Sequence, residues 1–322
     1  MSRILTGVQS TGTPHLGNIL GAIIPAIELS KKGENESFLF IADLHSLTQI
    51  KNASVLKQNT LATAAAWLAF GLDTDKTVFY RQSDVPLVTE LSWYLSCYYP
   101  YQRLTLAHSF KDKSENLKNV NTGLFSYPLL MAADILLYDA EYVPVGNDQL
   151  QHIEITRKVA SKFNLDNGET FVIPSPIIRE KHKIIPGIDG GKMSKSKNNT
   201  INIFLSDDEL KKQIMSIKTD SISIEKPKDP NKCTVFKIYS LVASDENIEE
   251  MKSMYLNGGF GYGAAKNILL EEILNKFKQE RKLFNSFIAD PDEVNLILNK
   301  GAQNAKIIAE SVIKRVRKKI GY

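Results

Sequence analysis

The first half of the chain alternates short apolar runs with longer segments whose apolar residues recur at helical spacing. Four such runs are predicted to be strands, at residues 3–8, 37–43, 77–81 and 141–145. Between them, residues 18–32 and 54–70 are expected to form helices, and a glycine follows each of these segments. Strands that alternate with helices are typical of a doubly wound α/β fold, a parallel sheet whose ligands bind at the carboxyl ends of its strands.

The pattern changes after about residue 200, where almost every segment has helical periodicity. We expect helices at residues 207–218, 232–243, 246–256, 263–288 and 302–320. Asp290 followed by Pro291 is a typical helix start. The glycine-rich segment 258–263 does not follow a predicted strand, so we interpret it as a turn between helices and not as a phosphate loop. The chain is therefore predicted to carry a smaller C-terminal α-helical domain.

The composition of the 322 residues fits a globular protein with one large and one smaller domain. A net charge of +4 is compatible with a nucleic-acid partner but does not by itself indicate one. Cys97 and Cys233 are far apart and the histidines are scattered, which argues against a structural zinc site and a disulfide framework. With no apolar signal region and no run long enough to span a bilayer, we expect a cytoplasmic protein without a membrane partner.

A polar, glycine-containing turn joins the first predicted strand to the first predicted helix. Its sequence, GVQSTGTPHLGN, spans residues 7–18. The free N–H groups and the dipole of a helix N-terminus attract anions, and His15 and Asn18 add polar side chains there. The turn is therefore a candidate phosphate site. Taken alone, an ordinary turn with incidental polar residues explains it equally well.

Three lysines fall within six residues of the segment GGKMSKSKNN, residues 190–199. The two glycines give the backbone freedom and the two asparagines disfavour an immediate helix, so we predict a mobile, cationic loop. Clustered lysines are usually a solvated charge run. The alternative is a loop that closes over a polyphosphate.

A single carboxylate, Asp134, interrupts the apolar segment SYPLLMAADILLY, residues 126–138. A buried, unpaired carboxylate is costly, so Asp134 needs a partner. That partner is either a structural contact within the protein or a ligand. The next predicted strand ends in a Gly-Asn-Asp-Gln turn at residues 146–149, which is a second candidate site at the carboxyl edge of the sheet.

The segments HLGN (15–18) and KMSKS (192–196) together resemble the two signature motifs of class I aminoacyl-tRNA synthetases. The first motif usually ends in a second histidine, and asparagine in that place is typical of the tryptophanyl branch. From residue 4 nearly to the C-terminus, the order and spacing of further segments are similar to the bacterial tryptophanyl-tRNA synthetase family. These segments are HSFKDKS (108–114), VPVGNDQLQHIEITR (143–157), PGIDGGKMSKS (186–196) and KCTVFKIYSL (232–241).

The resemblance implies a Rossmann-like catalytic domain over residues 1–188, on which a C-terminal helix of about 289–322 packs back. Residues 189–288 would form the KMSKS loop and a helical domain that binds the tRNA anticodon. Lys192, Lys195 and His15 would be catalytic through charge stabilisation of phosphoryl oxygens. The residues implied for ATP binding are Gln9, Ser10, Thr11, Gly17, Asn18, Gly146, Asn147, Asp148, Ile184, Lys192, Met193, Ser194, Lys195 and Ser196.

The same resemblance implies that Asp134, Tyr127, Gln149 and Gly7 hold L-tryptophan, with Asp134 accepting a hydrogen bond from the indole N–H. The activity would be that of a tryptophan–tRNA ligase. Its substrates would be L-tryptophan, ATP and tRNA(Trp), with Mg²⁺ on the pyrophosphate oxygens and no metal site built from protein residues. The family implies a homodimer, for which the aromatic-rich residues 93–99 are a candidate interface, although an ordinary core helix explains them equally well.

Three other interpretations fit parts of the sequence. The first is a tyrosyl-tRNA synthetase, which shares the fold and both signatures. The second is a nucleotidylyltransferase of the same superfamily that uses no tRNA. The third is a synthetase paralogue that has lost catalysis and serves as an RNA-binding or amino-acid-sensing protein. The cationic tail 314–319 is either a tRNA contact or a favourable set of charges at a helix C-terminus.

Overall fold

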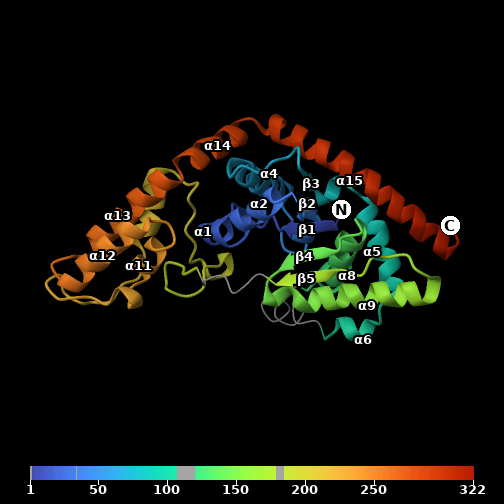
Figure 1. The fold of residues 1–322 in the computed structure, drawn as a ribbon, viewed down its shortest axis with the longest axis horizontal. Helices are drawn as coiled ribbons and strands as arrows, with labels where there is room; N and C mark the ends of the chain where they lie inside the picture. The colour runs from blue at the N-terminus through green and yellow to red at the C-terminus, as the bar shows by residue number, and fades with distance from the viewer. Residues whose placement is uncertain (1, 34, 107–119, 179–184) are drawn as a thin grey trace.

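A parallel sheet forms the centre of the larger part of the molecule (Figure 1). The structure is a computed structural model that describes residues 2–33, 35–106, 120–178 and 185–322. Within these ranges the strands are β1 (Ser2–Val8), β2 (Asn35–Ile41), β3 (Thr77–Arg81), β4 (Tyr142–Val145) and β5 (Ser175–Ile178). The first four confirm the predicted strands to within two residues. β5 was not predicted because Pro174 and Pro176 interrupt its pattern, which an edge strand tolerates.

The strand order is β3-β2-β1-β4-β5, and all neighbouring pairs are parallel. The chain runs outward from β1 to β3, then returns to the other side of β1 and runs outward again through β4 and β5. The order therefore reverses between β1 and β4. In doubly wound sheets the connections that leave the two strands at such a reversal diverge, and ligands bind in the crevice outside their carboxyl ends. This confirms the predicted doubly wound fold and places the expected ligand edge.

Helices cover both faces of the sheet because successive strand side chains point to opposite sides. In β2, Leu39 and Ile41 join one apolar cluster with α1 (Leu16–Asn18), α2 (Ile24–Lys31) and α4 (Ala53–Ala69). Phe38 and Phe40 join a second cluster on the other face. The helices of that second face are α5 (Leu87–Tyr98), α8 (Thr122–Leu136) and α9 (Leu150–Asn167).

The first predicted helix, 18–32, is not one regular α-helix. It begins as α1, passes through a π-helical segment at Ile19–Ile23, and continues as α2. Pro25 lies in the first turn of α2. Because proline has no N–H, it cannot continue the backbone ladder of a regular α-helix into the residues before it.

The C-terminal half is helical in the described ranges. Its helices are α10 (Asp207–Met215), α11 (Thr234–Tyr239), α12 (Asp245–Asn257), α13 (Tyr262–Lys276), α14 (Lys278–Ala289) and α15 (Pro291–Ile320). Asp290 accepts a hydrogen bond from the Glu293 N–H (3.2 Å), which confirms the predicted helix start. Gly258 and Gly259 have positive φ values between α12 and α13, which confirms the turn. The predicted helix 263–288 is divided at Phe277, and α15 runs without a break from the predicted start at Asp290-Pro291 through the predicted segment 302–320.

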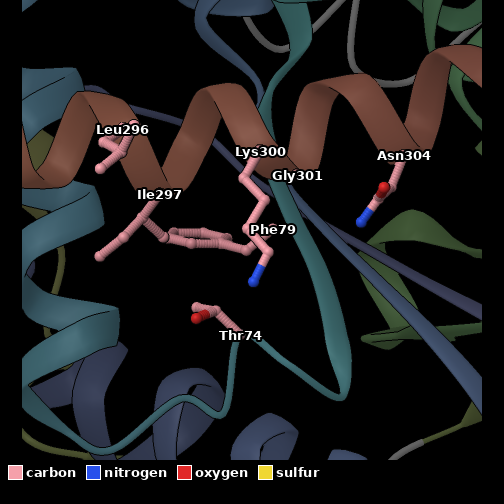
Figure 2. A pocket seen from close by; sticks show the side chains of 7 residues that line it. All are labelled: Thr74, Phe79, Leu296, Ile297, Lys300, Gly301 and Asn304. Atoms are coloured by element: carbon pink, nitrogen blue, oxygen red, sulfur yellow. The ribbon is translucent and has the colours of Figure 1, made fainter.

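α15 lies across β3, the edge strand of the described sheet (Figures 1 and 2). Gly301 makes this approach possible, because a Cβ atom there would lie 1.8 Å from the carbonyl oxygen of Phe79. Beside this contact is a small cavity of about 140 Å³ whose lining includes Thr74 and Lys300. The helix thus covers a strand edge that would otherwise be open to pairing.

One apolar core extends from α4 into the C-terminal helices. At the junction the Phe204 ring stacks on Phe284 with centroids 3.9 Å apart, and Phe70 contacts both Phe204 and Phe277 edge-on. None of the helices in the described ranges combines the length and apolarity needed to cross a bilayer.

Candidate active site

Ser10 anchors the turn after β1 through hydrogen bonds within the protein. This residue is fully buried, and both its backbone N–H and its hydroxyl lie 3.1 Å from the hydroxyl of Ser46, while Thr60 donates to it at 3.2 Å. Its N–H and hydroxyl are thus engaged within the protein, and the expected contact between Ser10 and ATP stays a prediction. Gln9 points elsewhere and donates to the Tyr127 hydroxyl (2.9 Å).

His15 is the N-cap of α1 and forms a reciprocal pair with Asn18. The His15 Nδ1 accepts from the Asn18 N–H, and the Asn18 Oδ1 accepts from the His15 N–H, each at 3.2 Å. Since Nδ1 is an acceptor, the proton of the neutral ring is on Nε2. Burial, and then the cation of Lys195, lower the pKa of His15 to about 4. At neutral pH His15 is therefore an uncharged ring with one N–H to donate.

The KMSKS segment contacts the HLGN segment directly. Residues 185–193 form a short hairpin in which Pro186 and Lys192 are bridged, and Met193 is buried at its end. The Gly17 N–H lies 3.3 Å from the Met193 sulfur, and the Leu16 N–H donates to the Ile201 carbonyl (2.8 Å). A Cβ at Gly17 would meet both His15 and Met193 at 3.0–3.3 Å, so glycine there permits the close approach. The structure thus brings together the two segments predicted to share a phosphate ligand.

Lys195 reaches across from the loop to the turn after β1. Its ammonium donates to the Gly12 carbonyl (2.8 Å). Loss of hydration lowers the pKa of Lys195 to about 8. The residue as a whole is exposed, so this loss concerns the end of the side chain, where the ammonium lies against the turn. Lys192 is also exposed, and the hydroxyls of Ser194 and Ser196 are 2.8 Å apart.

The second wall of the crevice follows β4. Gly146, Asn147 and Asp148 are exposed there, in and before the short helix η3 (Asn147–Gln149). Gln149 donates to Asp148 (3.0 Å), and its Oε1 is 2.8 Å from the Nδ1 of His152 in α9. These groups lie at the carboxyl end of β4, the neighbour of β1, as the topology predicts.

Asp134, in α8, is 2% exposed and already has partners within the protein. The Gln82 amide donates to both of its oxygens (2.7 and 2.9 Å), and the Nε2 of His45 lies 2.8 Å from Oδ2. Of the two kinds of partner that the sequence leaves open for Asp134, the structure shows contacts within the protein. Burial raises the pKa of Asp134, and the hydrogen bonds from His45 and Gln82 oppose that rise.

His45 and Gln82 are the residues that sequence reasoning missed. His45 lies in α3 (Asp43–Ser46), directly after β2, and Gln82 directly follows β3. His45 donates through Nε2 to a carboxylate, and its buried Nδ1 has no hydrogen-bond partner in the part of the chain that the structure describes. A signal was present, because both are polar residues at the carboxyl ends of strands in a doubly wound sheet.

Aromatic rings surround this carboxylate cluster. The Tyr127 ring lies 4.3 Å from His45 and 5.5 Å from His152, centroid to centroid. Burial raises the pKa of Tyr127 to about 12, so its hydroxyl stays protonated. On β1, a Cβ at Gly7 would lie 2.5 Å from the Phe40 ring, which explains glycine at that position.

Of the remaining residues and segments predicted from the sequence, some lie within the described ranges and some do not. Thr11 lies half-buried in the turn after β1. Ile184 and the segment 108–114 lie outside the described residues. Among the residues that the structure describes, no three His, Cys, Asp or Glu side chains gather closely enough to hold a metal ion.

Comparison with known proteins identifies the family to which this fold and this candidate active site belong. The family model "tRNA synthetases class I (W and Y)" matches residues 1–279. Two similar relatives are tryptophan–tRNA ligases, from Campylobacter jejuni (strain RM1221) and Fusobacterium nucleatum. The first is 45% identical over 320 residues, 99% of both chains, and the second is 45% identical over 322 residues, 100% of this chain and 98% of the relative. The fold and the site are thus those of a class I aminoacyl-tRNA synthetase.

Solved structures narrow the assignment. Tryptophanyl-tRNA synthetase from Campylobacter jejuni, complexed with ADP and tryptophan, has a TM-score of 0.96 at 45% identity, covering 99% of this chain and 100% of that one. Tyrosyl-tRNA synthetase from Archaeoglobus fulgidus, complexed with L-tyrosine, has a TM-score of 0.64 at 19% identity, covering 88% and 90% of the two chains, which shows the fold alone. The chain belongs to the tryptophan–tRNA ligase family.

Proposed function

We propose that the protein activates L-tryptophan with ATP, forming tryptophanyl-adenylate and pyrophosphate, and then transfers tryptophan to the 3′ end of tRNA(Trp). The observation that carries the proposal is the direct contact between the HLGN and KMSKS segments at the carboxyl end of β1, beside the buried Asp134 cluster. The HLGN and KMSKS segments would supply hydrogen-bond donors and cations for the phosphates of a nucleotide. The cluster supplies buried hydrogen-bond acceptors for a polar group on an aromatic ligand.

In the first step, a carboxylate oxygen of tryptophan forms a bond to the α-phosphorus of ATP. The bond between the α-phosphorus and the oxygen bridging to the β-phosphorus breaks, and its electron pair leaves with pyrophosphate. The attacking carboxylate is already ionised, so the step needs no general base. Catalysis then depends on positioning the reactants and on stabilising charge on the phosphoryl oxygens.

Lys192, Lys195 and His15 would provide that stabilisation. The two lysines are exposed cations on a loop next to the nucleotide turn, and Lys195 would exchange the Gly12 carbonyl for a phosphate oxygen. The neutral ring of His15 would donate its Nε2–H to the phosphates without transferring a proton. Ser194 and Ser196 would add hydroxyl donors.

The remaining nucleotide contacts come from both walls of the crevice. Gly17 leaves room for a flat ring against the first turn of α1. The other residues proposed here are Gln9, Thr11, Asn18, Gly146, Asn147, Asp148 and Met193, together with Ile184.

Tryptophan would bind with its indole at Asp134. A carboxylate can accept about four hydrogen bonds, and protein donors make three contacts with it, so one site remains for the indole N–H. The unpartnered Nδ1 of His45 is a second buried acceptor in the same cluster. Tyr127 and Gln149 would hold the ammonium and carboxylate ends of the amino acid. Gly7 is also proposed to contact tryptophan.

Mg²⁺ enters this scheme as part of the substrate, MgATP. The ion would be held by the pyrophosphate oxygens and would lower the negative charge there. No protein residue is assigned to it.

Residues 1–188 would form the catalytic domain, completed by α15, and residues 189–288 would carry the KMSKS loop and the anticodon-binding helices. A homodimer is proposed because α5 and α6 (Tyr101–Leu104) present large exposed apolar side chains. Trp93 is 69% exposed and Tyr101 is 65% exposed, which is costly on a monomer. We place the protein in the cytoplasm, where its tRNA substrate is.

Charging of purified tRNA with radiolabelled tryptophan tests the proposal. We expect stable tryptophanyl-tRNA that requires ATP, and no tyrosyl-tRNA above background. Charging with tyrosine would support the tyrosyl interpretation. Adenylate formation without charging would support a nucleotidylyltransferase, and tryptophan binding without either reaction would support a paralogue that has lost catalysis.

A further inference from the structure

We propose that Asn199 is a positioning residue that sets the backbone of the KMSKS segment so that Lys192 and Lys195 meet the phosphates of ATP. This inference deepens the proposed function and rests on it. Asn199 lies three residues after the signature and was predicted only to discourage a helix. In the structure it is 1% exposed, although the residues around it in the loop are mostly exposed.

The Asn199 side chain spans the loop from inside. Its Oδ1 accepts from the Ser194 N–H (2.7 Å), and its Nδ2 donates to the Lys192 carbonyl (3.0 Å) and to the Asp189 Oδ1 (2.8 Å). Both amide protons are therefore in use. The two backbone groups that it holds lie on either side of Met193, which is buried against Gly17.

Asp189 and Gly187 complete the set of contacts around Asn199, which we call the Asn199 brace. Asp189 also accepts from the Gly191 N–H (3.0 Å), and the hydrogen bonds from Asn199 and Gly191 hold the pKa of Asp189 below its usual range. The Ile188 N–H donates to the Asn199 carbonyl (2.9 Å). A Cβ at Gly187 would lie 2.4 Å from the Asn199 carbonyl oxygen and 2.5 Å from its Cγ, so glycine there leaves the space that Asn199 fills.

The orientation of the catalytic lysines follows from this brace. Lys192 and Lys195 are exposed, so their own side-chain packing does not fix the loop. The loop backbone is fixed where Asn199 holds Lys192 and Ser194 and where Met193 inserts. When Met193 is held in this way, Lys195 extends to the turn after β1, where its ammonium contacts the Gly12 carbonyl. Asn199 thus acts on the phosphates through the lysines, without touching the substrate.

Steady-state pyrophosphate exchange on the full-length protein tests this role. For Asn199→Ala we expect kcat/KM for ATP to fall about 10- to 100-fold, because several hydrogen bonds to the loop backbone are lost. KM for tryptophan should stay within about twofold of wild type, since the Asp134 cluster is untouched. The matched control is Asn198→Gly. Asn198 is exposed and has φ +50°, a conformation that glycine adopts without strain, so this variant should behave as wild type.

Asn199→Asp gives a readout that a purely structural role does not predict. The new carboxylate keeps the acceptor for Ser194 but faces Asp189, and the cation of Lys197 acts on the same pair. Two adjacent carboxylates share a proton, so the pKa of one of them is raised. Lowering the pH should restore a donor, and the ratio of variant to wild-type kcat/KM for ATP should rise as the pH falls from about 8 to about 6.

The possible outcomes distinguish failure of the positioning role of Asn199 from failure of the proposed function. An active wild type together with wild-type ATP kinetics in Asn199→Ala overturns the positioning role. So does an equal loss in the ATP and tryptophan parameters, or an Asn199→Asp deficit that does not change with pH. If Asn199→Ala does not fold, as judged by circular dichroism, the pH series on Asn199→Asp decides. An inactive wild type refutes the proposed function instead.

Discussion

The charge state of Lys195 gives the site a pH dependence that can be measured. Its ammonium lies against the Gly12 carbonyl, and loss of hydration lowers the pKa to about 8. Burial disfavours the charged form, so raising the pH through this value removes the cation from the free enzyme. The lysine is about nine-tenths charged at about pH 7 and about one-tenth charged at about pH 9.

This titration should appear in kcat/KM for ATP, which at saturating tryptophan reports ionisations of the enzyme–tryptophan complex that ATP binds. If only the ammonium stabilises the phosphoryl charge, kcat/KM for ATP falls about tenfold between about pH 7 and pH 9. The assay is pyrophosphate exchange at saturating tryptophan, so that ionisation of free tryptophan does not enter the measurement. Lys195→Ala should lower adenylate formation by a few orders of magnitude and remove the pH limb, while tryptophan binding stays near normal.

Two variants make the prediction specific. Lys195→Arg keeps its charge over the whole range, so its profile should lack the alkaline limb even if its absolute rate is lower. Lys197→Ala, at an exposed neighbouring lysine, should retain the limb. A limb of the same midpoint in Lys195→Arg would show that another group titrates, and an unchanged exchange rate in Lys195→Ala would remove Lys195 from the mechanism.

Three further predictions follow from contacts described above. Asp134→Asn leaves His45 and Gln82 without their carboxylate, so the Kd for tryptophan should rise about 10- to 100-fold in fluorescence titration while ATP binding is retained; an unchanged Kd would contradict the assignment. Gly301→Ala should destabilise the protein by more than about 3 kcal/mol in urea unfolding, because a Cβ overlaps the Phe79 carbonyl; normal stability would contradict the α15 packing. Trp93→Asp with Tyr101→Asp should yield monomers in sedimentation, whereas an unaffected dimer would place the interface elsewhere.

Much of the fold could be predicted from local patterns. β1 to β4 are apolar runs bounded by turn residues, and α15 begins at an Asp-Pro pair, so neighbouring residues carry the signal. The π-helical segment before Pro25 and the break at Phe277 depend on packing against other elements, which periodicity does not contain. β5 depends on its position at the edge of the sheet, where two prolines are tolerated.

The site was predicted unevenly for the same reason. The HLGN and KMSKS segments are contiguous motifs, and the structure brings them into contact although Gly17 and Met193 are 176 positions apart in the sequence. The partners of Asp134 lie 52 and 89 positions away in the sequence, each just after a different strand. Local sequence cannot show such pairings, so the sequence alone left open whether the partner of Asp134 belongs to the protein or to a ligand. The burial of Ser10 against Ser46 was likewise not predictable, because it depends on α3.

The central claim is that this chain activates tryptophan with ATP in the crevice between β1 and β4. The most direct measurement is ATP–pyrophosphate exchange by the purified protein with each of the standard amino acids supplied singly. We expect robust exchange with tryptophan and exchange at background level with tyrosine and the others. Exchange that is independent of amino acid, or driven best by tyrosine, would contradict it.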